Sequence, residues 1–167
     1  MPSPTTTHQR SRAWLFLLAT GLLVGALDII AAFTNYYIAT GKGPEGVLRY
    51  IASGVFGEQA FNGRGSMMLW GLFFHYIIAF ACTLVFYVLY PRFIFFIRFP
   101  ILSALLYSIL IWLITTRVIV PLSNVPQSGK PPDFWQALKS IAILFFMISL
   151  PLSLLTRRHF KVARKGL

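Results

Sequence analysis

The sequence is poor in charged residues, and acidic ones are especially scarce. Asp and Glu together occur 4 times among 167 residues, against 15 for Lys and Arg, and charged residues make up 11% of the chain. Soluble globular domains carry about 25% charged residues, so this composition excludes an ordinary water-soluble fold. With 57% hydrophobic residues and a mean hydropathy of +0.71, the chain is predicted to be an integral membrane protein.

Cysteine and histidine are also scarce, which removes several kinds of site. The single cysteine, Cys82, excludes an intrachain disulfide and a cysteine metal cluster. Only His75 lies in an apolar run, because His8 and His159 are near the chain ends, so a haem held by paired histidines is not expected. The sequence also has no Gly-rich phosphate loop and no nucleophile elbow. We therefore expect no cofactor, no metal and no catalytic residue, and we favour a protein that is not an enzyme.

Four apolar runs are long enough to cross a bilayer, which takes about 20 helical residues. They cover residues 14–36, 68–90, 100–122 and 135–155. This pattern predicts an all-α fold, an integral membrane bundle of four transmembrane helices within a single domain at residues 13–156. A cytoplasmic tail would precede it at residues 1–12, and a basic cytoplasmic tail would follow at residues 157–167. Because Pro151 lies inside the fourth run, a kink is expected there.

Basic residues gather on one side of this zigzag of helices. Arg10, Arg12, Arg92, Arg98, Arg157, Arg158, Lys161, Arg164 and Lys165 all fall on the side of the termini. The opposite loops carry Lys42, Arg49, Arg64 and Lys130, offset by Glu45, Glu58 and Asp133. The positive-inside rule therefore predicts that both termini are cytoplasmic. We expect the basic C-terminal tail to contact anionic headgroups of membrane lipids, and we expect no nucleic acid partner.

The first outer loop carries the pattern of a short amphipathic helix at residues 44–56. Apolar side chains recur there at helical spacing, and Pro44 suits the first helical position. This helix could lie in the membrane interface as a brace or cover the outer mouth of the bundle as a lid. The candidate lid residues are Glu45, Arg49, Ser53 and Glu58.

Asp28 is a carboxylate inside the first apolar run, where a charged side chain costs about 2.5–3.5 kcal/mol on insertion scales. Its helix face also carries Gly21, Gly25, Ala32 and Asn35. The second run has a similar face of small and polar residues, made of Gly71, His75, Ala79 and Cys82. Because small residues at this spacing let helices approach closely, we expect the first two helices to pair through these faces.

Ionisable residues of all four helices share the outer half of the bilayer. At about 1.5 Å per residue, Asp28 lies roughly 12 Å deep, His75 roughly 10 Å, Arg117 roughly 8 Å and Lys139 roughly 6 Å. We predict an outer-facing polar pocket with Asp28, Asn35, His75 and Arg117 as candidate binding residues. Two alternatives stay open. Arg117 and Lys139 could extend to the interface, and Asp28 could only lock the helices through Arg117 or His75.

Three functions remain open. The favoured one is binding or passage of a small solute or a proton through the pocket, as a homo-oligomer if four helices enclose too little volume. The second is a structural or accessory subunit that works with a partner membrane protein. The third and weaker one is a membrane enzyme acting on a lipid or quinone, with His75 as the acid/base group.

Four strings also carry a family resemblance. In order they are GLLVGALDIIAAFTNYYI, PEGVLRYIASGVFGEQAFNG, GLFFHYIIA and VIVPLSNVP. With them the chain resembles a group of uncharacterised bacterial four-helix inner-membrane proteins, and it is loosely similar to the YagU-like proteins. The resemblance covers most of Gly21 to Leu154. It implies a location in the bacterial plasma membrane and this number of helices, and it implies no reaction.

Overall fold

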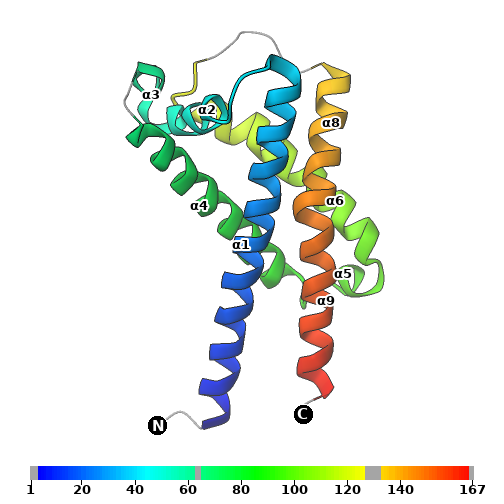
Figure 1. The fold of residues 1–167 in the computed structure, drawn as a ribbon. Helices are drawn as coiled ribbons and strands as arrows, with labels where there is room; N and C mark the ends of the chain where they lie inside the picture. The colour runs from blue at the N-terminus through cyan, green and yellow to red at the C-terminus, as the bar shows by residue number, and fades with distance from the viewer. Residues whose placement is uncertain (1–3, 63–64, 127–132, 166–167) are drawn as a thin grey trace.

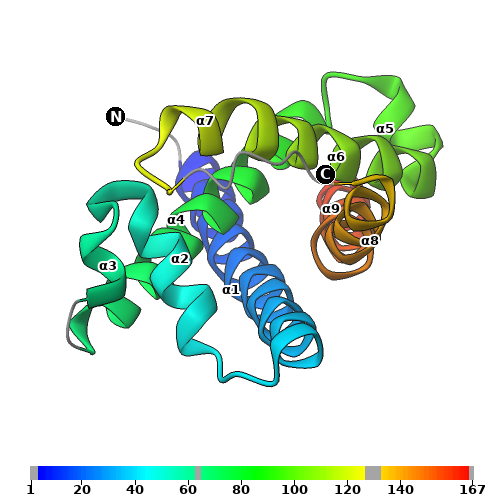
Figure 2. The same ribbon diagram turned by 90° about the horizontal axis from the view of Figure 1, so that it is seen from above.

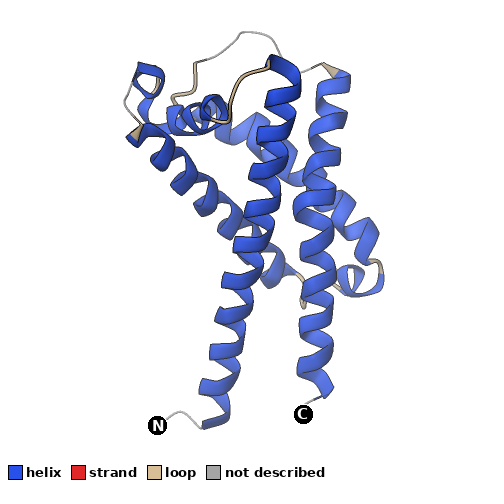
Figure 3. Cartoon of the chain, viewed as in Figure 1, coloured by secondary structure: helices blue, strands red, loops and turns tan. Residues whose placement is uncertain are grey.

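The computed structural model describes residues 4–62, 65–126 and 133–165, with side chains described from residue 12 to residue 161 within these ranges. Every regular element in the described ranges is helical (Figure 3). The elements are α1 (Pro4–Thr40), α2 (Glu45–Phe56), α3 (Gln59–Asn62), α4 (Ser66–Leu89), α5 (Ile94–Arg98), α6 (Pro100–Ile114), η1 (Thr115–Ile119), α7 (Val120–Leu122), α8 (Phe134–Leu144), η2 (Phe145–Ser149) and α9 (Leu150–Lys165). The predicted all-α class is confirmed.

Four helical stretches are long and apolar enough to cross a membrane. They run over Arg12–Thr40, Ser66–Leu89, Pro100–Leu122 and Phe134–Lys161. The four predicted runs are thus confirmed as helices, while their insertion into a membrane stays a prediction. The first and last helices are longer than expected, since α1 begins at Pro4 and α9 continues to Lys165. Both extensions occupy segments expected as tails, where no glycine or proline interrupts the helix.

The third and fourth long helices each contain one π-helical turn immediately before a proline. The turn η1 ends two residues before Pro121, and η2 ends two residues before Pro151. Proline has no backbone N–H and its ring clashes with the carbonyl four residues earlier. A π turn widens the helix over that stretch, so the helix continues through each proline. At Pro151, where a kink was expected, the structure has this π turn, and the kink itself stays a prediction.

Both described chain ends lie at one end of the molecule, which we call the inner end, and α2 lies across the opposite, outer end (Figure 1). The helix α1 and the stack of α8 and α9 run side by side along the length of the molecule. Seen from above, α2, α3 and the outer part of α4 lie on one side of α1, and α6 crosses α8 and α9 on the other (Figure 2). The loop helix α2 confirms the predicted helix at residues 44–56.

The core is an apolar cluster to which each long helix contributes. Its buried residues are Val24 of α1, Phe86 and Tyr90 at the end of α4, Tyr107 and Ile111 of α6, and Ile148 and Leu152 of η2 and α9. Two hydrogen bonds cross between helices beside it. The Tyr107 hydroxyl donates to the Cys82 carbonyl at 2.6 Å, and the Ser153 hydroxyl donates to the Pro100 carbonyl at 2.8 Å. The inner half is therefore closed by packing.

Candidate functional site

The helices α1 and α4 pack closely at the two glycines of α1, Gly21 and Gly25. A Cβ atom added to Gly25 would lie 2.8 Å from the ring of Tyr76 and 3.2 Å from the Cβ of Ala79. A Cβ atom on Gly21 would overlap the ring of Phe80. A side chain at either position would require an aromatic ring of α4 to move, so the predicted pairing of the first two helices through the glycine face of α1 is confirmed.

His75 fastens this contact with a hydrogen bond. Its side chain is 8% exposed, and its Nε2 atom lies 2.8 Å from the Gly25 carbonyl oxygen. Because a carbonyl oxygen only accepts hydrogen bonds, Nε2 carries the hydrogen and Nδ1 is the nitrogen that can gain or lose a proton. The His75 contact therefore has the same donor in the neutral ring and in the imidazolium.

Asp28 lies three residues after Gly25, slightly less than one helical turn along α1, and is partly buried. It is close enough to His75 for the two groups to interact electrostatically. Within the part of the chain that the structure describes, no Asp or Glu oxygen lies within 4.0 Å of a Lys, Arg or His nitrogen. Asp28 and Arg117 therefore form no ion pair. Neither of the two locking contacts considered for Asp28 forms among the described residues. His75 Nε2 lies against the Gly25 carbonyl instead, and Asp28 interacts with His75 only electrostatically.

Asn35 continues this face of α1 toward the outer end. It lies seven residues beyond Asp28, which is about 10 Å along the helix. Its Oδ1 atom is buried and has no hydrogen-bond partner among the described residues. A buried carbonyl oxygen without a donor costs about 1–3 kcal/mol, so Asn35 offers an unused acceptor on the outer side of Asp28.

The two cations predicted at the same depth are exposed, unlike Asp28, Asn35 and His75. Arg117 is in the π turn η1 and is exposed, and Lys139 on α8 is exposed as well. Long cationic side chains with an exposed head are typical of residues that extend to a membrane interface. The structure therefore places Asp28 within electrostatic range of His75, with Asn35 on the same face of α1, and Arg117 forms no ion pair with Asp28.

The candidate lid residues divide into two pairs. The Arg49 guanidinium donates to the Phe61 carbonyl at 2.6 Å and to the Ala60 carbonyl at 3.3 Å, which joins α2 to α3. Ser53 is completely buried, and its hydroxyl donates to the Tyr50 carbonyl at 2.7 Å. Glu45 and Glu58 are exposed. Arg49 and Ser53 are therefore engaged in contacts within the outer loop.

Two further contacts hold α2 in place, and sequence reasoning did not find them. A Cβ atom on Gly71 of α4 would overlap the Leu48 carbonyl of α2, so the two backbones touch. After α7, the Asn124 backbone N–H donates to the Gly54 carbonyl at 3.0 Å, and its side-chain Nδ2 donates to the Val55 carbonyl at 2.9 Å. These contacts favour the brace over the moving lid. Gly71 was expected to face α1, and it faces α2 instead.

A second group that sequence reasoning missed lies at the inner end, where rings of α1, α4 and α9 meet. The His159 ring stacks on Phe16 with centroids 4.2 Å apart, and its Nε2 atom lies 3.5 Å from the Tyr87 hydroxyl. Phe160 stacks on Tyr90 with centroids 5.2 Å apart. The cluster extends helix packing past the predicted end of the fourth span at residue 155.

Comparisons with protein-family models, curated proteins and solved structures find no match to this chain. The resemblance to bacterial four-helix membrane proteins accordingly stays a prediction. Among the described residues, His, Cys, Asp and Glu side chains form no group of three that could hold a metal ion.

Proposed function

We propose that the chain is a multi-pass membrane protein that binds a proton or a small solute at the contact of α1 and α4, around Asp28 and His75. The observation that carries this proposal is the hydrogen bond from His75 Nε2 to the Gly25 carbonyl. It joins two helices through a titratable ring and leaves the other ring nitrogen available. The unused Oδ1 of Asn35 supplies a further acceptor on the outer side.

The chemistry of this pair suits proton handling. His75 donates from Nε2 in both protonation states, so a proton can arrive at or leave Nδ1 while the helices stay fastened. Asp28 interacts electrostatically with His75 and is a second group at the site that can take up or release a proton. The charge of the site can therefore change without loss of the contact between α1 and α4.

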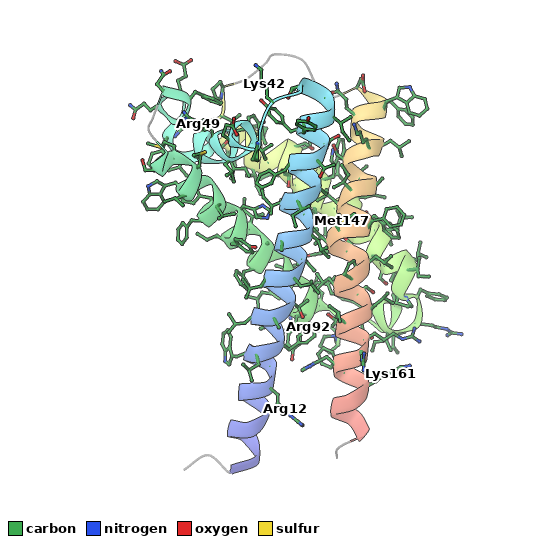
Figure 4. The ribbon with its side chains drawn as sticks, viewed as in Figure 1. Arg12, Lys42, Arg49, Arg92, Met147 and Lys161 are labelled. Atoms are coloured by element: carbon green, nitrogen blue, oxygen red, sulfur yellow. The ribbon has the colours of Figure 1, made fainter. Side chains whose placement is uncertain are left out.

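The proposal includes a location in a bacterial inner membrane, with both termini on the cytoplasmic side. In support, both chain ends lie at one end of the molecule, and Arg12, Arg92 and Lys161 lie toward that same end, whereas Lys42 and Arg49 lie at the other (Figure 4). An excess of basic residues is typical of the cytoplasmic side. The basic C-terminal segment would contact anionic lipid headgroups there.

A second candidate is a structural or accessory subunit, in which the same residues only hold the helices together. It is favoured by the close helix contacts at Gly25, where α4 side chains pack, and at Gly71, where the α2 backbone packs. Such contacts suit a rigid support for a partner membrane protein or a second copy of this chain. In this case Asp28 and His75 contribute to stability and bind nothing.

The two candidates are separated by Asp28→Asn, with Asp133→Asn as the control. Asp133 is the N-cap of α8 and accepts from the Gln136 N–H at 2.7 Å, so its replacement also removes one carboxylate but lies outside the proposed site. Thermal unfolding of the purified proteins would be followed across pH and with a panel of ions and metabolites, together with proton flux in proteoliposomes.

Binding at the site predicts that a ligand or a pH change stabilises the wild type and the Asp133 variant but not the Asp28 variant. It also predicts that proton flux depends on Asp28 and His75. A uniform loss of stability in Asp28→Asn, with every ligand response and flux equal to wild type, would contradict this function and favour the accessory subunit.

A further inference from the structure

The inner end of the molecule has many cations, and among the described residues no Asp or Glu side chain lies there to pair with them. The four acidic residues of the chain are Asp28, Glu45, Glu58 and Asp133. Asp28 lies in the middle of the long helix α1, and the other three belong to the outer loops or to the start of α8. The described cations at the inner end therefore have no acidic side chain as a partner.

Arg157 of α9 differs from its neighbours among these cations. It is partly buried, whereas the next residue, Arg158, is exposed. Its Nε atom is buried and has no hydrogen-bond partner among the described residues. No other nitrogen of this guanidinium is buried without a partner, and no described hydrogen bond involves Arg157, so its terminal nitrogens reach the surface.

The place of Arg157 on α9 is set by the contact one turn earlier. Residues four apart lie on the same helix face, and Ser153 donates to the Pro100 carbonyl at the start of α6. Arg157 therefore lies on the face of α9 toward the beginning of α6. Arg98 ends the helix α5 just before that point, is exposed, and lies 5.8 Å from the ring centre of Phe99.

A partly desolvated guanidinium without a partner attracts an anion more strongly than an exposed one. Its planar donors match the oxygen atoms of a phosphate group. The surroundings are apolar, since Leu154 on α9 and Ile101 and Leu102 on α6 are exposed hydrophobic residues. An anion that brings its own hydrocarbon chains fits such a place better than a soluble one.

We propose that Arg157, assisted by Arg98, binds the phosphate group of an anionic phospholipid at the inner end of α6 and α9, with the acyl chains along the exposed apolar residues. This inference rests on the membrane insertion proposed above and is independent of proton binding at Asp28. It assigns the lipid contact to one partly buried arginine, and not to the exposed basic tail as a whole.

The test compares Arg157→Gln with Arg158→Gln, two adjacent substitutions that change the net charge equally. The full-length protein, purified in detergent, would be titrated with phosphatidylglycerol, phosphatidylcholine or inorganic phosphate, and thermal stabilisation and lipid retention in native mass spectrometry would be measured. We expect phosphatidylglycerol to stabilise the wild type most. We expect the apparent affinity to fall about tenfold or more in Arg157→Gln and to change little in Arg158→Gln.

An equal loss in both variants would overturn the proposal, since it would show attraction to the overall charge. The proposal would also be overturned if phosphatidylcholine or inorganic phosphate stabilised the wild type as much as phosphatidylglycerol does. This comparison of ligands needs no variant. If Arg157→Gln does not fold, Arg157→Lys and Arg158→Lys replace the pair, and only the first should weaken lipid binding. Extraction of membranes with carbonate tests insertion separately, so failure of insertion is distinguishable from failure of the lipid site.

Discussion

Replacement of Gly71 by alanine should detach α2 from α4. A Cβ atom at this position would overlap the Leu48 carbonyl oxygen and would lie 2.7 Å from the carbonyl carbon and 3.0 Å from the Cα atom of Leu48. These are backbone atoms of a helix, so no side chain can turn away to make room. One methyl group must therefore push two helices apart.

The size of the effect follows from two opposing terms. Overpacking of a well-packed contact costs about 1–3 kcal/mol, and a contact with backbone belongs to the upper part of this range. Alanine in place of glycine gains up to about 1 kcal/mol of helix propensity. We expect a net loss of about 1–2 kcal/mol in the free energy of unfolding for Gly71→Ala.

Gly54 offers a matched control within α2 itself. A Cβ atom there would meet nothing nearer than Ser123 at 3.9 Å and Val125 at 4.0 Å, so Gly54→Ala should be neutral or should stabilise by up to about 1 kcal/mol. The assay is thermal unfolding of both variants in the same detergent, where 1 kcal/mol corresponds to about 2–4 °C. If Gly71→Ala unfolds at the same temperature as Gly54→Ala, the proposed backbone contact is wrong.

Two other predictions concern the outer end and the topology. Asn124→Asp removes the donor to the Val55 carbonyl and should destabilise the protein by about 0.5–1.5 kcal/mol. In the unfolding assay, Asn124→Gln should recover part of this loss, and equal stability of all three proteins would contradict the role of that bond. In a Cys82→Ser background, a thiol reagent that cannot cross membranes should label Lys42→Cys but not Lys161→Cys in intact cells. The reverse pattern would invert the proposed orientation.

The long helices could be predicted because the length of an apolar run is a local property. Their ends could not, since polar residues such as those of Pro4–Arg12 continue a helix wherever nothing breaks it. The two π turns depend on how a helix adapts to Pro121 and Pro151, which composition alone does not show. Local patterns thus predict that a helix exists, while its exact course depends on the tertiary structure.

The candidate site was predictable in part for a similar reason. Asp28 and His75 are conspicuous as ionisable residues in apolar runs, and the glycine face of α1 indicated which side would meet α4. The partner of Gly71 was not predictable, because a small residue permits close approach without specifying which helix approaches. Arg117 was placed by depth alone, and depth does not say on which side of its helix the side chain lies.

The position of α2 has a mechanical consequence for the outer end. Through Leu48 it rests on the backbone of α4 at Gly71, and through Gly54 and Val55 it is bonded to Asn124, just after α7. The helix therefore works as a cross-beam between the outer ends of the second and third long helices. A movement that separates those two ends must first break the hydrogen bonds of Asn124 to α2 or the backbone contact between Leu48 and Gly71.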